Sequence, residues 1–113
     1  MTTRKLERAE WREMFDKFSR TLGPKQAEME VAGLALGDQV EAEWLPLLGI
    51  VYDPKDDVAE VALEGLDHLI HKPREIWIDE EGGALNSLEI VDADGTRQIV
   101  KLRDPLMLPA PQT

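Results

Sequence analysis

The spacing of apolar side chains predicts one amphipathic helix near the N-terminus. Between residues 7 and 22 they recur at the spacing of a single helical face: Trp11, Met14, Phe15, Phe18 and Leu22. Leu6 lies off this face, so we expect it to pack as an entry residue ahead of the helix. Gly23-Pro24 follows, and we expect the helix to end there because glycine accepts a left-handed cap and proline cannot continue the turn.

After residue 26 the period of the pattern changes from 3.6 to two, which is typical of strands with one buried face. Turn residues separate these segments, most clearly Asp53-Pro54 and Asp94-Gly95. Consecutive hairpins without crossover helices favour an antiparallel sheet. We therefore expect an α+β fold, with the N-terminal helix packed on a strongly bent antiparallel sheet (a roll or open barrel) of about six strands. The predicted strands lie within residues 27–32, 39–45, 50–52, 58–63, 74–80, 86–92 and 96–103.

Three stretches do not fit this pattern. Residues 65–73 contain both histidines, and we expect a short helical turn or loop that ends at Pro73. Residues 44–49 and 105–111 are apolar and interrupted by proline, which breaks ladder pairing, so neither should be a central strand. They either cover an open end of the core or form an exposed patch for a partner. The candidate partner-binding residues are Trp44, Leu45, Leu47, Leu48, Leu106, Met107 and Leu108.

The length of the chain and its net charge limit the number of domains and the kinds of partner to expect. The 113 residues predict one domain, residues 1–113, with 104–113 as a proline-rich tail. The net charge is −10, and residues 27–64 carry ten acidic residues against one basic residue, Lys55. This balance disfavours nucleic-acid binding, which requires clustered basic residues. Four basic residues near the N-terminus, Arg4, Lys5, Arg8 and Arg12, are offset by neighbouring glutamates. No apolar run is long enough to span a bilayer and no signal peptide is evident, so we expect a cytoplasmic protein without a membrane role.

The candidate residues for chemistry are few. There is no cysteine, which excludes thiol catalysis and Cys-ligated metals. His68 and His71, with Asp67 beside them, would lie on one side of a helical turn and are weak candidates for a catalytic or metal site. Tyr52 and Asp53 would join them only if the fold brings them there. Because a closed metal site needs further ligands, we expect no metal and no cofactor.

Several stretches of the amino-acid sequence resemble those of a family of short bacterial proteins. The resemblance is carried by Glu10-Trp11, by residues 38–70 (DQVEAEWLPLLGIVYDPKDDVAEVALEGLDHLI), by residues 92–103 (DADGTRQIVKLR) and by Asp104-Pro105-Leu106. The family is a domain of unknown function (five-three-three-five), and the similarity covers nearly the whole chain. It implies a bacterial single-domain protein, and it supplies no activity, cofactor or catalytic residue.

These observations favour a non-enzymatic interaction or regulatory module that binds another protein or forms a homodimer. The alternative is a small enzyme or a metal- or ligand-binding barrel that uses Asp67, His68 and His71. An apolar pocket containing either histidine would favour the alternative.

Overall fold

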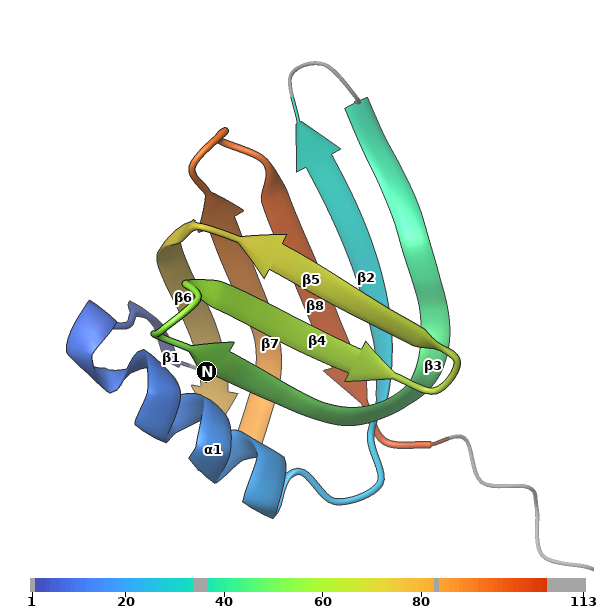
Figure 1. Cartoon of the computed structure of the whole chain (residues 1–113). Coiled ribbons are helices and arrows are strands. Elements are labelled where there is room, and N and C mark those ends of the chain that lie inside the picture. Colours follow the sequence, from blue (N-terminus) through green and yellow to red (C-terminus); the bar gives the residue numbers. More distant parts are fainter. Residues whose placement is uncertain (1, 34–36, 83, 106–113) are drawn as a thin grey trace, which may run out of the picture.

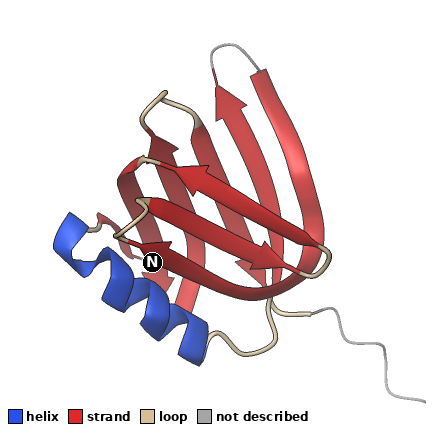
Figure 2. Ribbon diagram, in the orientation of Figure 1, coloured by secondary structure: helices blue, strands red, loops and turns tan. Residues whose placement is uncertain are grey.

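The chain folds into a single antiparallel sheet and one short α-helix (Figures 1 and 2). The computed structural model describes residues 2–33, 37–82 and 84–105. In chain order the elements are β1 (Thr2–Lys5), a 3-10 turn (Arg8–Glu10), α1 (Trp11–Thr21), β2 (Gln26–Gly33), β3 (Gly37–Asp53), β4 (Val58–Leu63), β5 (Leu66–His71), β6 (Pro73–Glu81), β7 (Ala84–Asp92) and β8 (Arg97–Arg103).

The sheet has eight strands in the order β1-β6-β7-β8-β2-β3-β4-β5 and does not close on itself. Its long strand β3 pairs with β2 through residues 37–46 and with β4 through residues 47–53. Figure 1 shows β3 curving so that β4 and β5 lie in front of β6, β7 and β8. The core fills the space between these two layers, with Met29, Ile50, Val61, Ile76 and Ile90 each 0% exposed. The predicted antiparallel sheet with an N-terminal helix is confirmed, but eight strands form rather than about six.

The prediction that residues 44–49 do not form a central strand needs correction, because β3 runs through all of them, pairing with β2 up to Pro46 and with β4 from Leu47. Irregular backbone makes this possible. Trp44 has a positive φ of 54°, and the register with β4 shifts between Leu47 and Gly49. Pro46 lies between these points, where the strand changes partners, and its carbonyl accepts a hydrogen bond from the Glu64 N–H at 2.9 Å. Proline is tolerated in a sheet at such bulges, where no ladder donor is required.

The prediction of a helical turn or loop over residues 65–73 is also wrong. Residues 66–71 form β5, which pairs with β4 in regular register from Val58–His71 to Leu63–Leu66. Lys72 alone, with a φ of 53°, separates β5 from β6, and Pro73 is the first residue of β6. Proline is accepted there because a first strand position needs no ladder donor.

The helix packs its apolar face onto the core. Trp11, Phe15 and Phe18 are at most 1% exposed, and Leu6 is 2% exposed ahead of the helix, as the pattern predicted. The α-helix begins at Trp11, after a 3-10 turn, rather than at residue 7. None of the helices in the described part of the chain is long and apolar enough to cross a membrane. Leu106, Met107 and Leu108 lie outside the described residues.

Candidate functional site

The three residues singled out for chemistry do not converge. Because β5 is a strand, successive side chains alternate between its two faces. Asp67 and His71 point outwards and are exposed, whereas His68 lies on the inner side with Leu66 and Ile70. The prediction that both histidines lie on one side is therefore wrong. It assumed helical spacing for a segment that is extended.

His68 is the half-buried member of the group. Burial lowers the pKa of its imidazole, and the nearby carboxylate of Glu41 opposes this effect. Among the described residues, no group of three or more histidine and carboxylate side chains is placed to hold a metal ion. The Tyr52 hydroxyl donates a hydrogen bond of 2.7 Å to Asp57. Desolvation and this carboxylate raise the pKa of Tyr52.

The predicted partner-binding residues in β3 have different environments. Leu47 is 5% exposed within the core, and Leu45 packs against the core from its margin. The half-buried ring of Trp44 lies under the Arg103 guanidinium, whose central carbon is 4.0 Å from the ring centroid. Leu48 is different, with 64% of its surface exposed. Of these four residues, Leu48 is therefore the one that offers a large apolar surface to solvent.

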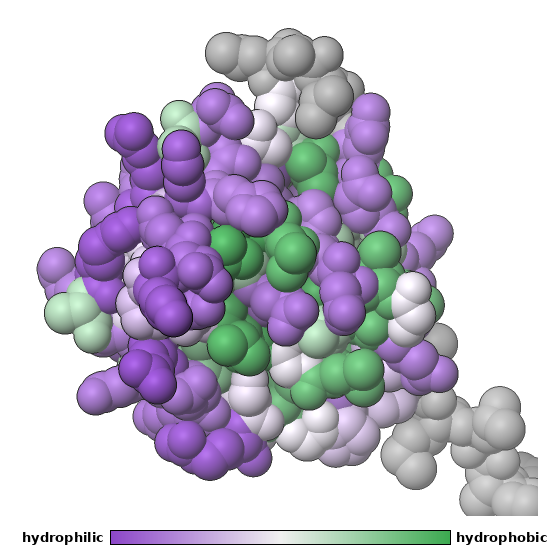
Figure 3. All heavy atoms as spheres, viewed as in Figure 1, coloured by the Kyte–Doolittle hydropathy of each residue, from purple (hydrophilic) through white to green (hydrophobic). Residues whose placement is uncertain are grey.

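A second apolar surface lies on the outer face of β3, β4 and β5. The strand register places Val51, Glu60 and Leu69 in one row across the three strands, and Asp53, Val58 and His71 in the next. Val51 is 45% exposed and Leu69 is 51% exposed. A shallow groove of about 370 Å³ runs over this face. Its lining combines Val51, Val58 and Leu69 with His71 and with the acidic residues Asp53, Asp56 and Glu60. Apolar residues also gather on this side of the molecule in Figure 3. We call these residues, Val51, Val58 and Leu69, the β5 patch.

The β5 patch adjoins a strand whose second edge is free. The sheet ends at β5, which in the described part of the chain pairs with β4 alone. The Lys72 N–H donates to the Asp57 carbonyl at 2.8 Å, just beyond the end of this ladder. Antiparallel strands alternate between hydrogen-bonded and non-hydrogen-bonded pairs. Residues 66, 68 and 70 therefore direct their backbone groups to β4, and the N–H and C=O groups of Asp67, Leu69 and His71 point away from it.

Two other edge segments of the sheet are protected, whereas residues 37–46 of β3 pair with β2 alone. Beside the second half of β3, helix α1 takes the place of a strand. There the Ser19 hydroxyl donates to the Ile50 carbonyl at 2.7 Å and accepts from the Ile50 N–H at 3.0 Å. The opposite edge strand, β1, has only four residues, including Arg4 and Lys5. Short length and basic side chains are common ways to block edge pairing. β5 is longer, has a regular register and presents Leu69 at its centre.

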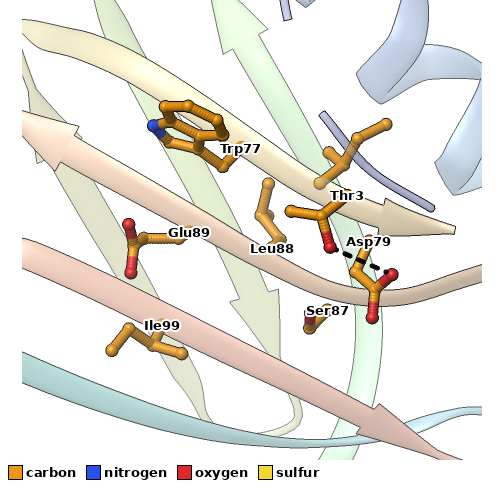
Figure 4. Close-up of a pocket in the computed structure, with 8 residues that line it drawn as sticks. Thr3, Trp77, Asp79, Ser87, Leu88, Glu89 and Ile99 are labelled. Carbon is orange, nitrogen blue, oxygen red and sulfur yellow. Dashed lines mark hydrogen bonds between the residues drawn. The ribbon is translucent and has the colours of Figure 1, made fainter. Parts of the chain in front are cut away.

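A separate groove lies on the outer face of β1, β6, β7 and β8 (Figure 4). It is lined by Trp77, Asp79, Ser87, Glu89 and Ile99 among others, and the Thr3 hydroxyl approaches Asp79 at 3.5 Å. Of its two carboxylates, Glu89 pairs with Arg97 and Asp79 accepts from the Thr3 hydroxyl.

The sequence analysis missed Leu69 as a surface residue. The signal was present, because Leu66, His68 and Ile70 alternate with Asp67, Leu69 and His71. An apolar residue on the solvent side and a histidine on the core side obscured this alternation.

Comparison with known proteins agrees with the resemblance noted from the sequence. A family of unknown function, DUF5335, matches residues 2–111. An uncharacterised protein of the bacterium Aquifex aeolicus (strain VF5) is 43% identical over 110 residues, which cover 96% of this chain and 99% of that protein. No solved structure matches the chain. The match over nearly the whole length shows that the chain belongs to the DUF5335 family of unknown function.

Proposed function

We propose that this protein is a non-enzymatic interaction module that binds a polypeptide along β5. The observation that carries the proposal is the combination of the exposed β5 patch with the free backbone groups of Asp67, Leu69 and His71. An added strand would satisfy these backbone groups, and its side chains would contact Leu69 and the adjoining groove. Leu48, 64% exposed, is a further apolar side chain on the outside of β3.

The chemistry of the described residues supports a binding role over catalysis. The one carboxylate and two histidines of the predicted site are divided between the two faces of β5. The grooves over β3–β5 and over β6–β8 are both wide open to solvent, whereas ligand pockets bury most of a small molecule. Main-chain pairing plus a few apolar contacts is the usual basis of strand addition.

Site-specific photocrosslinking tests this proposal. A benzophenone side chain at Leu69 should give discrete polypeptide adducts in the bacterial cell, whether the captured chain is a different protein or a second copy. The matched control is Val40, which is 56% exposed on β3 and lies outside the β5 patch. Adducts at position 69 no stronger than those at position 40 would refute an interaction along β5.

A further inference from the structure

We propose that the polypeptide bound by β5 is a second copy of this chain, paired antiparallel with β5 in a two-fold register centred on Leu69. This inference rests on the proposed function, because it names the partner of the same edge. It follows from the order of side chains and backbone groups along β5, which are complementary to themselves when the strand is reversed.

The backbone groups fit this register. Asp67, Leu69 and His71 carry the outward-pointing N–H and C=O groups, and they are spaced two residues apart. In a pairing centred on Leu69, that residue lies opposite its own copy, and Asp67 lies opposite His71 of the second chain. Each of these residue pairs exchanges two N–H···O=C bonds, as hydrogen-bonded antiparallel pairs do. All three residues with free backbone groups are then paired.

The side chains favour the same register. On the outer face, Leu69 contacts its copy at the two-fold axis, and the Asp67 carboxylate lies beside an imidazole at each end. Opposite charges and apolar residues are favourable cross-strand neighbours, and like charges are unfavourable ones. A register shifted by two residues opposes Leu69 to Asp67 or His71 and leaves one of the three residues beyond the end of the pairing. The centred register is therefore preferred over its neighbours.

The apolar surface becomes continuous across the contact. Val51 lies in the same cross-strand row as Leu69, separated from it by Glu60 of β4. Pairing at Leu69 joins this row to its symmetry-related copy in one extended sheet. A two-fold contact closes after two copies, since each chain uses its single β5 edge.

Two features limit the strength of the contact. It involves one strand of six residues from each copy, which is smaller than a stable interface of standard size. Each chain also carries a net charge of −10, so the copies repel one another at low ionic strength. We therefore expect a reversible dimer that forms as the protein concentration rises.

Sedimentation equilibrium of the full chain at physiological ionic strength, combined with charge exchange, tests the register. Leu69→Lys should raise the dimer dissociation constant by about tenfold or more, because it brings two ammonium groups together at the axis. Val40→Lys, an equally exposed apolar position outside the contact, should leave it unchanged. The unfolding midpoint of each variant shows that the monomer remains folded.

The decisive variants are His71→Asp and Asp67→Lys/His71→Asp. The single change opposes two carboxylates at each end of the pairing and should weaken the dimer by about tenfold. The double change opposes an ammonium to a carboxylate and should restore it. Failure of the double variant to recover, or a wild-type chain that stays monomeric at all concentrations, would overturn the inference. Adducts at position 69 that contain only a different protein would also overturn it, and would leave the proposed function standing.

Discussion

Removing the Ser19 hydroxyl should destabilise the protein through the edge of β3 rather than through the helix itself. This hydroxyl makes two hydrogen bonds to Ile50, one to its carbonyl and one from its N–H. Ile50 is 0% exposed, so water cannot replace either bond without a local opening of the fold. Ser19→Ala therefore leaves one buried donor and one buried acceptor without a partner.

The expected loss follows from the cost of such groups. A buried polar group without a partner costs about 1–3 kcal/mol, and a serine-to-alanine change in a helix returns a few tenths of a kcal/mol through helix propensity. We therefore expect Ser19→Ala to lower the free energy of unfolding by about 1–3 kcal/mol. For a chain of this size, that lowers the urea midpoint by roughly 0.5–1.5 M.

Thr21→Ala is the matched control on the same helix. The Thr21 hydroxyl is exposed and donates only to the Lys17 carbonyl within the helix, at 2.9 Å. Its removal should change the unfolding free energy by less than about 0.5 kcal/mol, as for most surface changes. Urea titrations followed by tryptophan fluorescence measure both variants. Equal midpoints for the two alanine variants would refute the role assigned to Ser19 in protecting this edge.

Four further outcomes are expected. Phe15→Ala should lower the unfolding free energy by about 3–5 kcal/mol, because the ring is fully buried, and an unchanged urea midpoint would contradict its place in the core. Tyr52→Phe should lower the free energy of unfolding by about 0.5–1.5 kcal/mol, because the hydrogen bond to Asp57 is lost, and the same urea titration measures it. A change of less than about 0.2 kcal/mol would show that this hydrogen bond does not contribute to stability. Because burial lowers the folded-state pKa of His68, the unfolded chain binds protons more readily, so the melting temperature should fall as the pH drops below the ordinary histidine range. His68→Gln should reduce that fall, and an equally steep fall in the variant would contradict this assignment. Self-association should strengthen as salt is raised from low to physiological concentration, because screening weakens the repulsion between two chains of net charge −10; weaker association on light scattering would show that this repulsion does not govern the contact.

The sequence predicts the hairpins well where one face of the strand is apolar and the turn is marked. Ala27, Met29 and Val31 alternate with polar residues and occupy buried positions of β2. The turn after Asp53 lies where Asp53-Pro54 placed it. In these segments the local pattern and the tertiary packing require the same residues.

The errors occur where tertiary structure overrides the local signal. Pro46 was taken as a strand breaker, but β3 passes from one partner strand to another at that residue. β1 was missed because Thr2–Lys5 has no apolar alternation and is held by pairing with β6. β5 was missed because Leu69 lies on its solvent side. The exposed Leu69, which made β5 hard to predict from the sequence, is also the centre of the candidate binding surface.

Amide hydrogen exchange along β5 tests the central claim most directly. The N–H groups of His68 and Ile70 face β4 and should exchange slowly at every protein concentration. Those of Asp67, Leu69 and His71 should exchange rapidly in dilute protein and become protected as the chain associates, in the alternating pattern that an added strand imposes. If these three amides remain as fast in concentrated as in dilute protein, β5 does not receive a second copy.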